Sequence, residues 1–388
     1  MPDNQVVAPS LSVLRERHSS KWRRFSPDVL PMHVAEMDFQ VAEPIQAVLT
    51  EMIQNSDLGY LGPVPEVAEA FAEFAATRWN WPVDAKQVKM ATDVGVAAVE
   101  IFRALGKPGD HVVINTPVYS AFFGWLAETH LTPMDVPLVQ SGSEWLLDLE
   151  GLEQAFAAGA KFYLLCHPHN PLGKVFTRAE LTAVAALAAR YNVLVISDEI
   201  HAPLTYAGQV FTPYLNCGPD AEATGVTITS SSKSWNTAGL KAAIVVSQSS
   251  EVAAKLAKLP PDMHWRSSLL GAFAMVEAYR NGTTWLDSAI ETIEVNYQHM
   301  VSEVAAKLPG VVIHRPVSGY LSWWDVSALK LGTEPGKVIL ERAKVAVVEG
   351  SDLGGAAAAN YTGFIRFNFG TSPANITEAI DRIAAIGK

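Results

Sequence analysis

The chain has 388 residues, of which 49% are hydrophobic and 18% charged, so it is long enough to bury a large core in about two domains. Its formal net charge of −11, without any Lys/Arg cluster, excludes a protein that binds nucleic acid through a basic surface. Only two cysteines, no apolar run of membrane-span length and no signal-peptide pattern predict a soluble, cytoplasmic protein without a disulfide framework.

The first predicted elements alternate short apolar runs with longer helical stretches. A turn at residues 92–95 opens a helix that ends near Leu105, and buried strands are predicted at residues 112–114, 162–166, 194–197 and 226–229. A helix over residues 178–190 begins with a capping box formed by Thr177 and Glu180. Strands that alternate with helices predict an α/β fold with a mostly parallel central sheet.

The chain after residue 284 shows a different order of elements. We expect a long amphipathic helix over residues 285–307, followed by strands at 311–314 and 320–326, a helix at 335–344, a strand at 364–369 and a last helix at 376–386. This order predicts a smaller α+β domain formed by residues 1–45 and 285–388. Residues 46–284 are then the large, ligand-binding domain.

Polar residues follow each predicted parallel strand directly. In chain order these include Tyr119, Asn170, Asp198 and the run Ser230-Ser231-Ser232-Lys233. Each residue alone has an ordinary role as a turn, cap or packing residue. Ligands of parallel sheets bind at the carboxyl ends of the strands, so the joint placement after four successive strands indicates one ligand site.

Lys233 and Asp198 are the residue types that pyridoxal 5′-phosphate (PLP) requires. The amine of Lys233 can form a Schiff base with the cofactor's aldehyde, and an acidic residue keeps the pyridine nitrogen protonated. Asp198 fits that second role because a buried carboxylate needs a cationic partner. Groups that can hold the phosphate are the hydroxyls and the helix-terminal N–H groups of Ser230, Ser232, Val94 and Gly95.

The order of these residues resembles that of the class I/II aminotransferases of fold type I. The resemblance covers nearly the whole chain and rests on Tyr119, Asn170-Pro171-Leu172-Gly173, Asp198-Glu199-Ile200-His201, Ser230-Ser231-Ser232-Lys233 and Arg366. It implies that Tyr119 stacks on the cofactor ring and that Asn170 bonds the phenolic oxygen. It also implies that Arg366 binds the carboxylate of an amino-acid substrate. The alternative for Arg366 is a solvated strand residue.

A further match lies in Leu58-Gly59-Tyr60. Tyr60 resembles a tyrosine of the family that reaches the phosphate of the neighbouring subunit. The resemblance therefore implies a homodimer whose active sites are shared between the subunits. A tyrosine packed within its own subunit is the alternative.

Residues 31–39 resemble a segment of the C–S lyases of the cystathionine β-lyase type, and residues 197–201, 232–236 and 319–323 agree with that branch. The resemblance implies α,β-elimination from cystathionine and related cysteine thioethers. The products would be pyruvate, ammonia and a thiol such as homocysteine, a reaction of methionine biosynthesis. The apolar Met37 and Phe39 suit a thioether stem, although ordinary core packing is equally open.

Two residues depart from the family pattern, and a third is an unusual residue type for its position. Lys241 stands where the superfamily often has a phosphate-binding arginine, and a lysine can hold phosphate only as a point charge. His201 stands where many aminotransferases have a tyrosine that bonds the phenolic oxygen, and a purely structural role is also open. We expect Asp93, an acidic residue at a phosphate turn, to cap the helix and point away.

Two other functions stay open. An aminotransferase would use the same groups but reprotonate the cofactor carbon. A binding or regulatory protein on the same fold is disfavoured by the intact Lys233, Asp198, Asn170 and Arg366. A metal site is not predicted, because His167 and His169 flank a proline without a suitable further ligand, and loop packing explains them.

Overall fold

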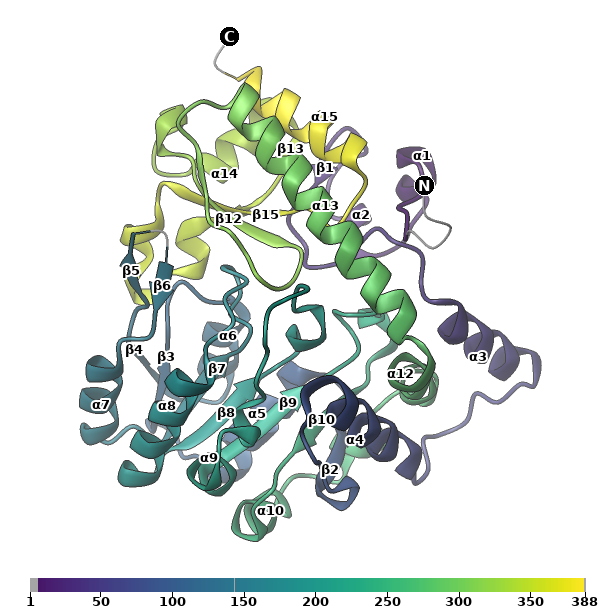
Figure 1. Cartoon of the computed structure of the whole chain (residues 1–388), viewed down its shortest axis with the longest axis vertical. Helices are drawn as coiled ribbons and strands as arrows, with labels where there is room; N and C mark the ends of the chain where they lie inside the picture. The colour runs from purple at the N-terminus through teal and green to yellow at the C-terminus, as the bar shows by residue number, and fades with distance from the viewer. Residues whose placement is uncertain (1–5, 143, 387–388) are drawn as a thin grey trace.

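The computed structural model describes residues 6–142 and 144–386, and its centre is a seven-stranded sheet (Figure 1). In spatial order the strands are β2 (Val88–Ala91), β10 (Ala243–Val246), β9 (Gly225–Thr229), β8 (Leu194–Asp198), β7 (Phe162–Cys166), β3 (His111–Ile114) and β4 (Thr132–Asp135). The strands from β9 to β4 are parallel, whereas β10 is antiparallel to both of its neighbours. The predicted α/β fold with a mostly parallel sheet is confirmed.

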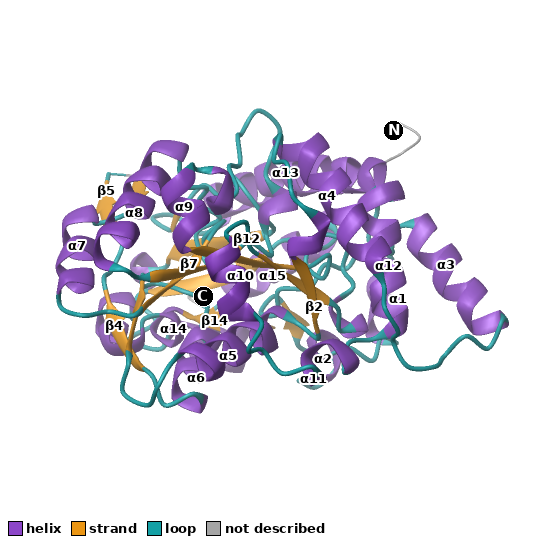
Figure 2. Cartoon of the chain, turned by 90° about the horizontal axis from the view of Figure 1, so that it is seen from below, coloured by secondary structure: helices purple, strands orange, loops and turns teal. Residues whose placement is uncertain are grey.

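Helices cover both faces of this sheet (Figure 2). One face carries α5 (Val94–Leu105) and α6 (Ala121–Glu128), and the other carries α7 (Leu149–Ala157), α8 (Arg178–Tyr191) and α9 (Pro219–Thr224). Side chains of β7 alternate between two cores: Phe162 and Leu164 pack with α5 and α6, whereas Tyr163 and Leu165 pack into the larger core on the other side. Burial on both faces explains why this strand reads as one apolar run.

The predicted helix starts are also found. Thr177 and Glu180 form the capping box at the start of α8, in which the Thr177 backbone N–H donates to Glu180 Oε2 at 2.7 Å. The helix that the turn at residues 92–95 was expected to open is α5, and it ends at Leu105 as predicted.

A second, four-stranded antiparallel sheet lies above the first in Figure 1. Its order is β11 (Val312–Ile313), β12 (Leu321–Asp325), β15 (Phe364–Asn368) and β14 (Val348–Glu349). The long helix α13 (Thr283–Lys307) packs beside the final helix α15 (Pro373–Ala384). The predicted helix at 335–344 is α14 (Pro335–Val338), which continues into a π-helical turn over Ile339–Ala343.

The N-terminal segment packs against the C-terminal part of the chain, which forms the second sheet. Strand β1 (Leu30–Pro31) pairs in parallel with β13 (Val345–Ala346). The other elements are α1 (Leu11–Arg15), α2 (Ser20–Arg23), α3 (Glu43–Gln54), α4 (Pro65–Trp79), β5 (Val139–Ser141), β6 (Glu144–Leu146), α10 (Ser250–Leu256), α11 (Asp262–Trp265) and α12 (Leu269–Asn281). We propose the division into 46–284 and 1–45 with 285–388 on the basis of these two sheets. Across the described residues, none of the helices combines the length and the apolar character of a membrane span.

Candidate active site

A cavity of about 290 Å³ lies where the parallel strands end. Tyr119, Asn170, Asp198 and Lys233 all line it, although they come from four separate segments of the chain. The structure thus brings together the four residues that follow the predicted strands. Parallel strands place their carboxyl ends at one edge, and this common edge explains the convergence.

Lys233 follows β9 and is held inside the cavity by the N-terminal segment. Its Nζ donates a hydrogen bond to the Ala35 carbonyl oxygen at 2.9 Å. Burial, with a smaller contribution from the Arg366 charge, lowers the pKa of Lys233 to about 8. A larger fraction of this amine is therefore neutral near pH 7 than for an exposed lysine, and a neutral amine can act as a nucleophile or a base.

Asp198 is the last residue of β8 and is only 4% exposed. Its Oδ1 accepts a hydrogen bond from the Ile200 backbone N–H at 3.2 Å. Burial raises the pKa of Asp198 to about 7, so its ionised form is costly in the protein alone. A cationic ligand group that pairs with the carboxylate offsets this cost, and the protonated pyridine of PLP is such a group.

Arg366 reaches the site from the second sheet. It lies on β15, is 5% exposed, and donates to Asn170 Oδ1 at 3.0 Å and to the His33 carbonyl oxygen at 2.8 Å. The alternative of a solvated strand residue is therefore wrong. Its buried Nε has no hydrogen-bond partner among the described residues. The lining of the cavity formed by the described residues includes Asn170 but not Arg366 itself, so the binding of a substrate carboxylate by Arg366 stays a prediction.

The residues proposed for the phosphate lie at one end of the cavity, which Val94, Gly95, Ser232 and Lys241 line. The backbone N–H groups of Val94 and Gly95, at the start of α5, have no acceptor within the described part of the chain. Ser230 lies behind Ser232, is 1% exposed, and its Oγ is 2.6 Å from Ser232 Oγ and donates to the Ala242 carbonyl oxygen at 2.6 Å. Donors at a helix start fit a bound phosphate.

Asp93 caps α5, as expected, by accepting a hydrogen bond from the Val96 N–H at 2.8 Å. The expectation that it points away from the site is wrong. Its Oδ2 forms an ion pair with Lys241 Nζ at 3.0 Å, and Asp93 lines the cavity. The acidic residue is tolerated there because the lysine that replaces the family's arginine neutralises it.

His201 lines the same cavity and is buried. Burial lowers the pKa of His201 to about 3, so its imidazole is neutral at physiological pH. The neighbouring Ser318 Oγ donates to the His201 carbonyl oxygen at 3.2 Å, which fixes the backbone rather than the ring. The imidazole is therefore available to a ligand, and the cofactor role of His201 stays a prediction.

Three further predicted site residues, besides Ser230 and Arg366, lie outside the cavity lining. Met37 and Phe39 are fully buried in the large hydrophobic core, and the cavity lining formed by the described residues does not include them. Their contact with substrate stays a prediction. Tyr60 is 96% exposed between α3 and α4, so the alternative of an aromatic packed within its own subunit is wrong.

The two histidines around Pro168 pack in loops, as expected. His167 Nε2 lies 3.1 Å from the Thr212 carbonyl oxygen, and His169 Nε2 lies 2.7 Å from the Pro117 carbonyl oxygen. Within residues 6–142 and 144–386, no three His, Cys, Asp or Glu side chains are grouped as a metal site requires.

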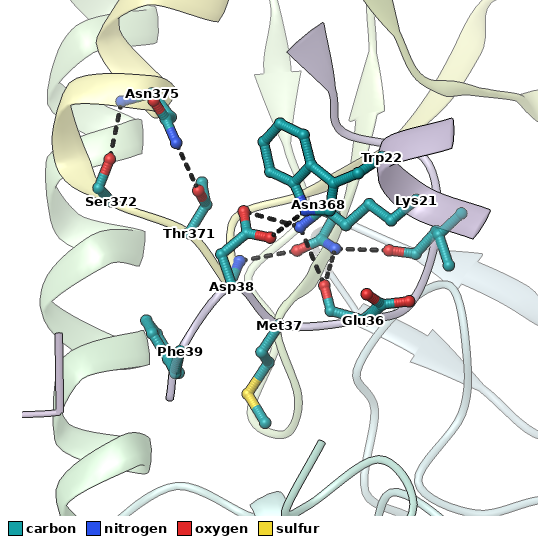
Figure 3. A network of polar contacts seen from close by, with 12 residues as sticks. Lys21, Trp22, Glu36, Met37, Asp38, Phe39, Asn368, Thr371, Ser372 and Asn375 are labelled. Carbon is teal, nitrogen blue, oxygen red and sulfur yellow. Dashed lines mark hydrogen bonds and ion pairs between the residues drawn. The ribbon is translucent and has the colours of Figure 1, made fainter. Parts of the chain in front are cut away.

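Sequence reasoning missed the polar contacts that hold the N-terminal segment in place beside the site (Figure 3). Lys21 and Asp38 form a buried ion pair at 2.9 Å, and Trp22 Nε1 donates to Asp38 Oδ1 at 3.0 Å. Asn368 Nδ2 donates to the Glu36 carbonyl oxygen at 2.8 Å. These contacts hold the segment that presents the Ala35 carbonyl to Lys233. A lysine and an aspartate 17 residues apart carry no local pattern that reveals such a pair.

Comparisons with known proteins agree with this geometry. The profile of the family "Aminotransferase class I and II" matches residues 27–383. The cystathionine beta-lyase of Corynebacterium glutamicum is 32% identical over 97% of this chain and 99% of its own. Cystathionine beta-lyase PatB of Bacillus subtilis is also 32% identical, over 92% of each chain. A crystal structure from Corynebacterium diphtheriae, of a protein assigned as a PLP-dependent beta-cystathionase, superposes with a TM-score of 0.91 at 33% identity and covers 98% of both chains.

Proposed function

Because the chain belongs to the class I and II aminotransferase family, we propose that it is a PLP-dependent C–S lyase that cleaves cystathionine and related cysteine thioethers. The observation that carries this proposal is the joint position of Lys233 and Asp198 in one cavity at the carboxyl ends of β9 and β8. PLP is the cofactor that requires an amine for its aldehyde and a buried carboxylate for its ring nitrogen.

Each residue would have a definite part in the elimination. PLP, when bound, supplies an electron sink for the charge that develops as the substrate's Cα loses its proton. Asp198 would hold the cationic ring nitrogen, Tyr119 and Asn170 would position the ring, and the amine of Lys233 would remove the Cα proton. Arg366 binds the α-carboxylate and so fixes the direction of the Cα–H bond.

The second bond to break is Cβ–S. Its electron pair leaves with sulfur, and the thiolate takes up a proton to give homocysteine when cystathionine is the substrate. The remaining three-carbon fragment is hydrolysed to pyruvate and ammonia. We also propose that the enzyme acts in the cytoplasm and in methionine biosynthesis. The free, buried state of both cysteines is consistent with a reducing compartment.

The reaction class is tested by product analysis. Holoenzyme mixed with cystathionine is expected to release pyruvate, ammonia and homocysteine in equal amounts without any added keto acid, because elimination needs no second substrate. The products are measured by coupled dehydrogenase assays and thiol titration. Amino-group exchange that depends on a supplied keto acid would show an aminotransferase instead. Binding of PLP without turnover of any amino acid would favour a binding or regulatory role.

We propose a homodimer in which Tyr60 completes the site of the neighbouring subunit. Tyr60 is 96% exposed and Leu58 is 58% exposed, so one segment places two large side chains in solvent. Such exposure is typical of a surface that a partner covers. Tyr60→Phe is expected to raise the PLP dissociation constant about tenfold, because one hydrogen bond to a charged group is lost. Spectroscopic titration of the apoenzyme measures this change, and sedimentation establishes the dimer.

Tyr191→Phe is the matched control, since the hydroxyl of Tyr191, the last residue of α8, donates to Glu153 of α7. Its PLP affinity is expected to equal that of the parent. A monomer that retains full activity at nanomolar dilution would contradict the shared site.

A further inference from the structure

The indole of Trp125 packs directly on the start of α5. A Cβ built on Gly95 would lie 3.0 Å from Trp125 Cζ2 and 3.1 Å from Trp125 Nε1. Only a glycine at this position admits the indole so close to the helix start, because a Cβ there would press on the ring. The N–H edge of Trp125 therefore lies beside the second residue of α5.

The ring is fixed in this position by other aromatic side chains. Phe122, one turn earlier on α6, packs against it with centroids 5.1 Å apart. Tyr119 meets it edge-on, with centroids 6.1 Å apart and planes at 80°. The same Tyr119 is the residue proposed to stack on the cofactor ring, so Trp125 contacts both that residue and the start of α5, where the phosphate is proposed to bind.

The N–H group of this indole is unused. Trp125 is half-buried and lines the cavity, and its Nε1 forms no side-chain hydrogen bond with the residues that the structure describes. By contrast, the indole N–H of Trp81 donates to Gln248 Oε1 at 2.9 Å, and that of Trp235 donates to the Gly282 carbonyl oxygen at 2.9 Å. A tryptophan in a cavity wall whose N–H has no protein acceptor has a donor ready for a ligand.

The charges at this end of the cavity make an uncharged donor useful. Lys241 lines the cavity, and it is paired at 3.0 Å with Asp93, the residue that caps α5. Because the pair is close to neutral, it attracts a phosphate less than the free arginine of the family pattern would. Within one subunit, the N–H groups of Val94 and Gly95 and the hydroxyl of Ser232 are then the remaining donors proposed so far.

We propose that Trp125 is a further cofactor-binding residue, whose Nε1–H donates a hydrogen bond to the phosphate of PLP. This inference rests on the proposed function, since it presupposes that the cavity binds PLP. Gly95 then has two roles. Its backbone N–H is a donor for the phosphate, and its lack of a side chain leaves the space that the indole needs. It also explains how a site without the usual arginine holds a dianion.

The test compares two ligands that differ only in the phosphate. Apoenzyme is titrated with PLP and with pyridoxal, and binding is followed by absorption. Trp125→Phe keeps an aromatic ring but removes the N–H, so the dissociation constant for PLP is expected to rise about tenfold. The constant for pyridoxal is expected to stay within about twofold of the parent's, because it carries no phosphate.

Trp285→Phe on α13 is the control, and its PLP affinity is expected to equal the parent's. Gly95→Ala is expected to weaken PLP binding in the parent but much less in the Trp125→Phe background, since the displaced indole is then already absent. Equal weakening of PLP and pyridoxal by Trp125→Phe, or no weakening of either, would overturn the proposal. If the parent itself binds no PLP, the proposed function fails first. Far-ultraviolet circular dichroism confirms that each variant is folded.

Discussion

Lys233→Ala is expected to lose the visible absorption of the lysine-bound cofactor and to lower kcat for cystathionine cleavage about 10⁴-fold. The substitution removes both the attachment point and the base that takes the Cα proton. It leaves Asp198, Asn170 and Arg366 in place, so PLP can still enter the cavity by its phosphate and ring contacts. Absorption spectra and single-turnover kinetics of the PLP-loaded variant measure the two effects separately.

Lys255→Ala serves as the control, because Lys255 pairs only with Glu251 on α10 at the surface. It is expected to keep the parent's spectrum and kcat. A Lys233→Ala variant that still gave a borohydride-reducible bond to PLP would place the attachment at another amine, and Lys241 is the next lysine that lines the cavity.

Asp198→Asn is expected to lower kcat roughly 100- to 1,000-fold while the protein still binds PLP. An amide cannot hold a proton on the cofactor's ring nitrogen, so the ring withdraws electrons less strongly from Cα. Asp220→Asn, on the exposed side of α9, is the matched control and is expected to be as active as the parent. Unchanged kcat in Asp198→Asn would show that the carboxylate does not face the ring nitrogen.

The same substitution has a signature in the cofactor-free protein. Burial raises the folded-state pKa of Asp198 to about 7 from 3.8, so the folded protein holds this proton more tightly than the unfolded chain does. The free energy of unfolding of the parent therefore loses the contribution of this group as the pH rises from about 4 to about 7. The amide variant has no such loss. The Tm of Asp198→Asn minus that of the parent is expected to increase over this range and to level off above it.

Much of the central sheet could be predicted because its strands are buried on both faces. β7 appears in the sequence as the unbroken apolar run Phe162–Cys166, with the bounds that were predicted. β2 was missed because it lies at one edge of the sheet and exposes Lys89. β4, at the other edge, contains Pro133 and has no fully buried residue. β10 is as buried as β7, but it is antiparallel and no polar ligand-binding residues mark its end.

The residues of the candidate site could be predicted only where they come directly after an apolar run that forms a strand. Tyr119, Asn170, Asp198 and Lys233 each lie at or after the end of a parallel strand, and the topology then brings them together. The Arg366–Asn170 contact joins residues 196 positions apart, so the resemblance suggested Arg366 but no local pattern could place it against Asn170. The Ala35–Lys233 contact joins residues 198 positions apart, and neither the family resemblance nor a local sequence pattern indicated it. Such contacts depend on how two separate sheets pack.

Arg366 and Lys233 stand on different sheets, the first on β15 of the antiparallel sheet and the second after β9 of the parallel one. The spacing between the proposed carboxylate anchor and the proposed proton acceptor is therefore a property of tertiary packing and not of either sheet alone. A substrate held at both ends acts as a crosslink between the two halves of the molecule. Binding of the substrate by both residues is therefore coupled to the packing of the two halves against each other. The more tightly the substrate binds, the more it stabilises that packed arrangement.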